Sequence, residues 1–330
     1  MSGKPRRKGR GFSASEREVL RGGSMSGIVW HIFAFGAIGI FLIVITYRTL
    51  AIIRLPVHLR WELAPIPHEK GKGRYGGSYL EEYEWWNKPQ HRSRIAPIIY
   101  MAKEIFLMRG IWEHHRALWP LTFAFHMGIY LIVGMLLLQV VSAVFIITEV
   151  PLSVLNVFLG IASVLALVGY LLGSLGAIGL ILKRALDSNL RPFNTISKYF
   201  NLLFLGAVFI SGGYAWLHSG DLASEMSFFI KRLITLDAGV TVTFPLSLHV
   251  VISLLFILYL PWTNMIHFIA KYFTYHEIRW NDTPQDEKME KELRGLLAQP
   301  VSWSATHVKA DGKKNWVDIT TEKMSDEKES

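Results

Sequence analysis

Residues 245–275 read PLSLHVVISLLFILYLPWTNMIHFIAKYFTY, and this stretch decides the fold. Between Leu246 and Ala270 it is apolar and uncharged apart from two histidines. About 20 consecutive apolar residues are enough for a helix to cross the hydrocarbon core of a membrane. Pro245 suits a first helical turn, and Lys271 marks the far boundary. The stretch therefore predicts a membrane-spanning helix, kinked at Pro261 with a freed backbone carbonyl.

The two histidines in this span, His249 and His267, are 18 positions apart. In a regular helix this spacing is about five whole turns and about 27 Å of rise, so both imidazoles would point the same way near opposite ends of the span. Ionisable side chains inside membranes usually mark functional sites. The spacing fits two stacked metal centres. The alternative is a pair of core histidines hydrogen-bonded to the backbone.

The composition of the whole chain also indicates a polytopic membrane protein. Of its 330 residues, 51% are hydrophobic and 18% are charged, and the mean hydropathy is +0.29. The chain contains no cysteine, which excludes structural disulfides, cysteine-ligated iron–sulfur clusters and thioether-attached haem on this chain. The net charge of +9 is concentrated in the tails and one loop, where it favours a role in membrane topology over nucleic-acid binding.

Four further apolar stretches lie before residues 245–275 in the chain. They cover about residues 28–47, 118–147, 151–182 and 199–217. Together with 245–275 they predict an all-α fold, a polytopic membrane helical bundle with five transmembrane helices. Four glycines of the third stretch predict close helix packing, with a porphyrin pressed against them as the alternative: Gly169, Gly173, Gly176 and Gly179.

The remaining segments divide the chain into three parts. Residues 1–24 form a basic tail, which would not be translated if synthesis starts at Met25. Residues 25–280 form the membrane domain, with a polar loop at about 54–116 that includes a predicted amphipathic helix over 95–112. Residues 228–234, FFIKRLI, are expected to lie along the membrane interface. Residues 281–330 form a charged tail that we expect to be soluble and partly disordered.

The distribution of Lys and Arg predicts the orientation in the cell (cytoplasmic) membrane. Basic residues follow the first, third and fifth spans, whereas the link after the second span contains only Glu149 as a charged residue. The positive-inside rule then places these loops and the C-terminus in the cytoplasm and the N-terminus outside. The basic tail 1–24 conflicts with this orientation unless translation starts at Met25 or the short tail crosses regardless.

This topology brings His126 of the second span to the depth of His267 in the antiparallel fifth span, within about one helical turn. Two facing imidazoles are what bis-histidine ligation of a b-type haem requires. Arg116 and Lys271 are candidates to pair with haem propionates, or they only flank the spans. Zinc is the weaker alternative, because structural zinc sites usually take four N or S ligands.

The stretch FAFHMGIYLIVG (123–134), together with 245–268, resembles the membrane cytochrome b family of the respiratory nitrate reductase gamma subunit. The likeness covers roughly residues 110–280 and implies five spans with two b haems held by histidines of the second and fifth helices. On this resemblance His126 and His267 are the iron ligands of a haem near the cytoplasmic side, and His249 is a ligand of a second haem near the outer face.

The sequence departs from that family at one ligand position. The family pattern expects a second histidine ten residues after His126, where this chain has Leu136. The outer haem would then be five-coordinate, take a replacement ligand or be absent. His31 and His218 are the candidate replacements by depth, and the alternative for each is an interfacial histidine facing lipid headgroups.

The long first loop and the C-terminal tail are more similar to cytochrome b subunits of the sulfite-reduction-associated (Dsr) and Hme electron-transfer complexes. That resemblance implies exchange of electrons with menaquinone, and a heterodisulfide-reductase-like iron–sulfur partner on the cytoplasmic side. It also implies a multihaem cytochrome c outside. The chain would be an electron-transfer subunit of a larger respiratory oxidoreductase, without catalytic residues of its own. Candidate quinone-site residues are Gln139, Ser142 and Glu149.

A second hypothesis of another class is a haem-free membrane anchor or a transporter subunit whose histidines relay protons. Transporters often show internal repeats with broken helices in matching halves. The chain shows no such repeat, and an odd number of spans does not divide into two equal halves. The depth-matched histidines favour the cytochrome.

Overall fold

The computed structural model describes residues 27–57, 66–69, 71, 72, 75, 77–85, 88, 93–275, 278–280, 286–303, 308 and 310–322. These residues form helices and connecting turns, with no strand among them. The basic tail 1–24 and Met25 lie outside the described residues.

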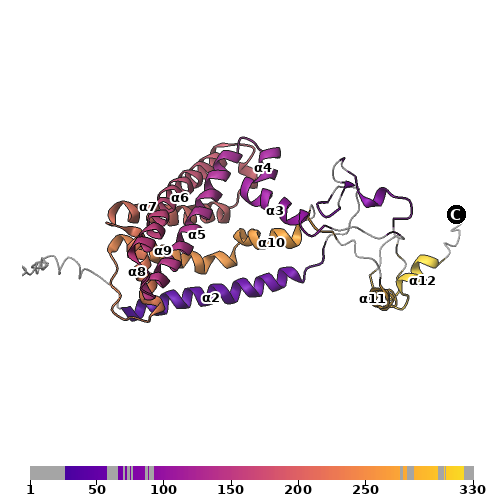
Figure 1. The fold of residues 1–330 in the computed structure, drawn as a ribbon. Coiled ribbons are helices and arrows are strands. Elements are labelled where there is room, and N and C mark those ends of the chain that lie inside the picture. Colours follow the sequence, from indigo (N-terminus) through magenta and orange to yellow (C-terminus); the bar gives the residue numbers. More distant parts are fainter. Residues whose placement is uncertain are drawn as a thin grey trace, which may run out of the picture.

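Among the described residues, five helices are long and apolar enough to cross a membrane. They are α2 (Gly27–Ile53), α5 (Trp119–Ile147), α6 (Leu152–Leu186), α7 (Ile196–His218) and the span Phe244–Trp262, which contains α9 (Phe244–Tyr259). Figure 1 shows them as one bundle. The prediction of an all-α, multi-pass membrane protein is confirmed.

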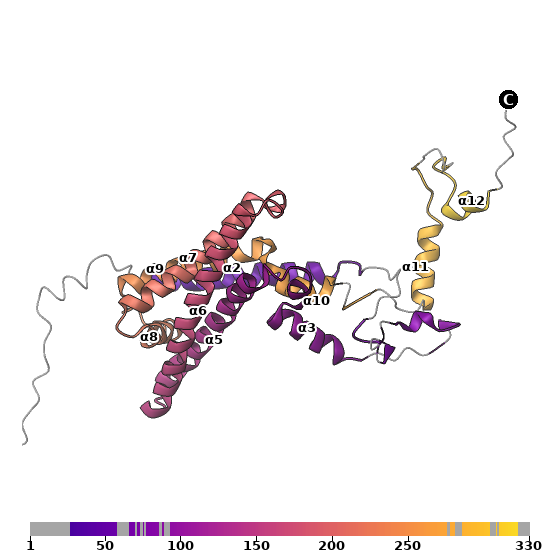
Figure 2. The ribbon, with the colours of Figure 1, turned by 90° about the horizontal axis from the view of Figure 1, so that it is seen from above.

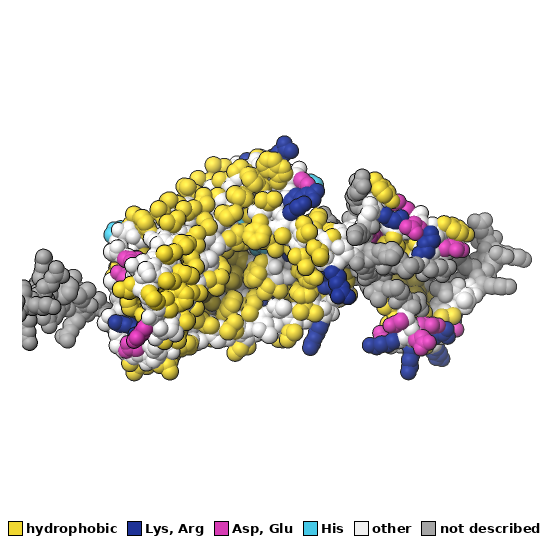
Figure 3. All heavy atoms as spheres, viewed as in Figure 1, with side chains coloured by type: hydrophobic (Ala, Val, Ile, Leu, Met, Phe, Trp, Pro, Cys, Tyr) yellow, Lys and Arg dark blue, Asp and Glu magenta, His cyan; other side chains and the backbone are white. Residues whose placement is uncertain are grey.

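The surface of the bundle agrees with burial in lipid. Figure 3 shows hydrophobic side chains over most of its visible side, with charged side chains gathered toward the two ends. All spans are helical because lipid offers no partner for the backbone N–H and C=O groups, which must therefore bond within each segment.

Glycines let α5 and α6 pack backbone to backbone. A Cβ atom at Gly128 would lie 2.5 Å from the Cα atom of Gly173, and one at Gly176 would lie 2.4 Å from the backbone nitrogen of Phe125. Such short contacts cannot accommodate a side chain. The glycines of the third span therefore serve close helix packing, as predicted, rather than a porphyrin face.

The fifth span is not one regular helix. After α9 the chain forms two 3-10 turns, η5 (Leu260–Trp262) and η6 (Asn264–Ile266), and then the helix α10 (His267–Thr274). The kink predicted at Pro261 is confirmed, but the prediction that His249 and His267 share one helical phase is wrong. The interruption sets the direction of His267 independently of His249.

Shorter helices cover the two ends of the bundle. At one end, here called the α8 end, α8 (Leu222–Ile234) packs against α5 and α9, where a helix along the interface was predicted. At the other, the α10 end, lie α3 (Ala96–Leu107) and α4 (Arg109–His114) (Figures 1 and 2). One amphipathic helix was predicted over 95–112, but Met108 adopts a left-handed conformation (φ 49°) and divides it. Two 3-10 turns lie in the loops: η2 (Tyr79–Glu81) and η4 (Arg191–Phe193).

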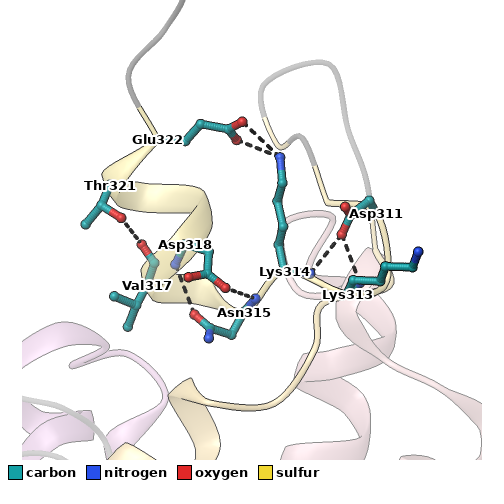
Figure 4. Close-up of polar contacts among 8 residues, drawn as sticks. All are labelled: Asp311, Lys313, Lys314, Asn315, Val317, Asp318, Thr321 and Glu322. Carbon is teal, nitrogen blue, oxygen red and sulfur yellow. Dashed lines mark hydrogen bonds and ion pairs between the residues drawn. The ribbon is translucent and has the colours of Figure 1, made fainter.

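The C-terminal segment has local structure beyond the α10 end, in α11 (Glu287–Leu297) and α12 (Trp316–Thr321) (Figures 1 and 2). Figure 4 shows how α12 begins: Asn315 and Asp318 bond each other's backbone N–H in a capping box. Lys314 Nζ lies 2.9 Å from both carboxylate oxygens of Glu322. The described part of this tail therefore contains two helices.

Candidate functional site

The structure brings two of the predicted ligands together at the α10 end. The ring centroids of His126, on α5, and His267, at the start of α10, are 6.3 Å apart, with 71° between the ring planes. A metal ion between two imidazole nitrogens needs a centroid separation of about 6 Å, since each metal–nitrogen bond is about 2 Å long and the nitrogen lies about 1 Å from the ring centre. The spacing of the His126–His267 pair fits one axially ligated iron.

Both rings are oriented by backbone carbonyl groups. His126 Nδ1 is 2.8 Å from the carbonyl oxygen of Thr122, and His267 Nδ1 is 3.3 Å from that of Asn264. Within the described part of the chain, Nε2 of neither ring makes a hydrogen bond. A histidine that binds a metal through one ring nitrogen usually donates the N–H of the other nitrogen to a carbonyl or carboxylate oxygen, and the two rings here have that arrangement available. His267 is also exposed on the surface of the bundle.

The interruption that aims His267 is held by Arg48 of α2. Its guanidinium Nη1 donates to the carbonyl oxygen of Pro261 at 2.9 Å and lies 3.4 Å from that of Thr263. Both carbonyl groups belong to the interrupted segment between α9 and α10, outside regular α-helix. Sequence reasoning counted Arg48 among the charges that follow the first span, because it placed the end of that span at residue 47. The structure extends α2 to Ile53, so Arg48 lies inside the helix.

A second polar contact links the same segment to α7. Asn201, which is buried, donates from Nδ2 to Asn264 Oδ1 at 3.2 Å and accepts the hydroxyl proton of Tyr259 at 2.7 Å. Asn264, whose carbonyl group orients His267, is therefore held in place by the hydrogen bond between its own side chain and Asn201. Sequence reasoning missed Asn201 and Tyr259; the available signal was a lone asparagine near the start of an apolar span.

The α3–α4 segment is tied to α10 one turn beyond His267. Lys271 Nζ lies 2.5 Å from Glu104 Oε1, and Glu104 Oε2 accepts the backbone N–H of Gly110 at 2.9 Å. Tyr130, one turn beyond His126, donates its hydroxyl proton to the carbonyl oxygen of Ile105 at 2.9 Å. Lys271, a candidate propionate partner, thus has a carboxylate partner of its own.

Arg116, the other candidate propionate partner, lies over the ring of Trp112, with its Cζ atom 5.0 Å from the centroid. The zinc alternative gains no support, because the described residues contain no cluster of three or more His, Cys, Asp or Glu side chains placed to hold a metal ion.

His249, the third predicted ligand, lies elsewhere and is 4% exposed. Its Nε2 is 3.0 Å from the hydroxyl of Tyr170 on α6, and its Nδ1 is 3.1 Å from Ser211 Oγ on α7. Both ring nitrogens therefore have side-chain partners. His249 is therefore a buried core histidine, and the residues around it do not fit an axial iron ligand.

The candidate replacement ligands also have other surroundings. His31 Nδ1 is 2.7 Å from the carbonyl oxygen of Gly27, and its Nε2 is 3.3 Å from that of Arg232. His218 is exposed, and its ring lies 4.2 Å from that of Tyr214. Leu136, where the resemblance expects a histidine, is 43% exposed on the apolar surface.

Two of the predicted quinone-site residues are buried without partners. Gln139 and Ser142 of α5 are 0% exposed, and neither the amide atoms of Gln139 nor the hydroxyl of Ser142 makes a hydrogen bond with the described residues. Buried polar groups normally have a protein or water partner. Glu149 lies in the exposed turn between α5 and α6 with φ 53°.

The polar loop contains one charge cluster that the structure describes. Lys72 Nζ lies 2.7 Å from Glu82 Oε1, and Lys88 Nζ lies 3.2 Å from Glu82 Oε2. The hydrogen bonds to Lys72 and Lys88 lower the pKa of the Glu82 carboxyl. Lys72 and Glu82 are partly exposed, and Lys88 is exposed.

Comparisons with protein-family models, with curated proteins and with solved structures gave no match for this chain.

Proposed function

We propose that this chain is the membrane cytochrome b subunit of a respiratory electron-transfer complex, with one haem b held between His126 and His267. The observation that carries the proposal is the facing histidine pair, 6.3 Å between ring centroids, with each Nδ1 near a carbonyl oxygen and each Nε2 free of hydrogen bonds among the described residues. A bound b haem supplies one-electron transfer at a potential set by its axial ligands, its burial and nearby hydrogen bonds.

The residues of this chain would do three things for that group. His126 and His267 would bind the iron, and the carbonyl groups of Thr122 and Asn264 would fix the ring tautomers with the proton on Nδ1. The apolar spans would exclude water from the site, which limits reorganisation when its charge changes.

The distribution of Lys and Arg supports the orientation that we propose, and the family resemblance supports the partners. We propose that the α10 end faces the cytoplasm, where the loop 54–116 and the C-terminal segment would contact an iron–sulfur protein of the heterodisulfide-reductase type. Three leucines of α11 are exposed on that segment and support a docking role: Leu293, Leu296 and Leu297. A multihaem cytochrome c outside the membrane belongs to the same proposal.

We further propose menaquinone as the electron-exchange partner within the membrane. The unpartnered polar atoms of Gln139 and Ser142 support a small polar site at the α8 end of α5. Quinone oxygens and water both have the chemistry to pair with an amide and a hydroxyl.

A dithionite-reduced minus oxidised spectrum of the detergent-purified chain, with pyridine-haemochrome quantification, tests the proposal. We expect a b-type α band that is lost in His126→Ala and in His267→Ala. His218→Ala is the matched control, because His218 Nδ1 also lies near a carbonyl oxygen of its own helix but the ring is remote from the pair. No haem in wild-type protein made with adequate haem supply would refute the cytochrome and favour an anchor or transporter with proton-relay histidines.

A further inference from the structure

The part of the bundle that the family resemblance assigns to an outer haem is already filled by side chains. His249 on α9, Tyr170 on α6 and Ser211 on α7 are each buried, with exposed fractions of 4%, 3% and 5%. They meet through the two hydrogen bonds of the His249 ring. Three different helices are thereby joined at one point.

The hydrogen bonds of this group form a self-consistent set. Ser211 Oγ lies 3.0 Å from the carbonyl oxygen of Val208, to which its single hydroxyl proton can be donated. Ser211 Oγ then accepts from His249 Nδ1–H, and His249 Nε2 is left as the acceptor for the Tyr170 hydroxyl. The lone pair that would bind iron is therefore the one that Tyr170 uses.

Tyr170 is held at this position by close packing. A Cβ atom at Gly212 would lie only 2.1 Å from the ring, so the tyrosine lies directly against the backbone of α7. On its other side the hydroxyl is 3.8 Å from Met135 Sδ of α5. Tyr170 thus lies between the backbone of α7 and the Met135 side chain of α5.

The part of α5 next to this group has no histidine that could be a second ligand. Met135 is the α5 residue that contacts this group, whereas the neighbouring Leu136 points to the apolar surface. A histidine at 136 would therefore face lipid and not His249. The lack of a histidine at position 136 and the hydrogen bond at His249 Nε2 both argue against a haem at this place.

We propose that this chain binds a single haem, and that Tyr170, His249 and Ser211 form a structural hydrogen-bonded clasp in place of an outer haem site. The inference rests on the proposed function, because it counts haems in a chain proposed to bind one at the His126–His267 pair. It follows that the half of the membrane toward the α8 end has no haem from this chain. Electrons that reach the outer face must then use menaquinone or another subunit.

The test is haem stoichiometry and redox titration of the full-length protein in detergent. We expect one haem per chain and a single one-electron component. In His249→Gln we expect the same haem content, α band and midpoint potential, with a lowered melting temperature. In His267→Ala we expect the haem to be lost. Two haems per chain, or loss of one redox component in His249→Gln, would overturn the inference.

Tyr170→Phe provides a second, independent measurement if His249→Gln does not fold. It removes only the hydroxyl group, and we expect a lower melting temperature with unchanged haem content. A double variant with His249→Leu, where it can be prepared, should melt close to the His249→Leu single variant, because leucine offers the Tyr170 hydroxyl no acceptor and both changes then break the same hydrogen bond. A melting temperature of Tyr170→Phe equal to wild type would mean that the clasp does not exist. Wild-type protein with no haem would instead refute the proposed function, and the Tyr170→Phe measurement would still test the clasp.

Discussion

Replacing Arg48 by methionine should release the segment that carries His267. The substitution keeps an unbranched side chain in α2 but removes the donor of the 2.9 Å hydrogen bond to the carbonyl oxygen of Pro261. The loss of a hydrogen bond from a charged donor costs about 1.5–3 kcal/mol. We give the 3.4 Å contact with Thr263 no separate weight, since it is long for a hydrogen bond. If the proposed haem is bound at the His126–His267 pair and this hydrogen bond holds α10 in place, Arg48→Met should bind haem roughly 10- to 100-fold more weakly, the usual effect of losing a group that orients a metal ligand.

The assay is transfer of haem from the purified protein to an excess of apomyoglobin, followed by its absorbance. We expect faster transfer from Arg48→Met than from wild type. Arg54→Met is the matched control: it removes the same charge just beyond the end of α2, at an exposed position. Equal transfer from Arg48→Met and Arg54→Met would refute the reasoning that Arg48 holds the interruption.

Three further predictions concern the packing and charges around the site. Glu104→Gln should lower the free energy of unfolding by about 1–2 kcal/mol, because it removes the charge partner of the partly exposed Lys271. An unchanged melting temperature of Glu104→Gln would contradict this prediction. Gly128→Val should give no monodisperse peak in size-exclusion chromatography, because the Cβ atom of the new side chain would collide with the backbone of α6. Gly160→Ala should elute as wild type, because a Cβ atom at Gly160 has no neighbouring atom within 4 Å. The ion pairs of Glu82 lower the pKa of its carboxyl group in the folded protein. Their contribution to stability should be complete at pH values above the pKa of the unfolded chain, and it should disappear as the pH falls through the lowered pKa of the folded protein. Carboxyl NMR titration checks the direction, and an unshifted or raised pKa would contradict the ion pairing.

The approximate boundaries of four spans could be predicted from the sequence, because length and apolar composition alone determine whether a helix can cross a membrane. The predicted spans at 28–47, 118–147, 151–182 and 199–217 correspond to α2, α5, α6 and α7, with differences of a few residues at most ends. The close packing at the glycines of α6 was also predictable, since glycine leaves room for a neighbouring backbone.

The pairing of His126 with His267 was likewise predicted, from depth in antiparallel spans, and the structure brings the two rings together. Its interpretation as a haem site stays a prediction. The helical phase of His249 and His267 was predicted wrongly, because a count of residues assumes a regular helix and the 3-10 turns at 260–266 break that regularity.

Length and apolar composition, read from the sequence, were therefore sufficient to find the five spans that the described residues contain. What only the tertiary structure decided was which atoms meet. The free Nε2 of His126 and His267 differ from the occupied Nε2 of His249 because Tyr170, 79 residues away in sequence, packs against Gly212 and reaches that nitrogen. Arg48 is separated from Pro261 by 213 residues, and no local pattern connects them. Depth in a membrane is a property of one segment, whereas hydrogen-bond partners between helices depend on how the segments pack.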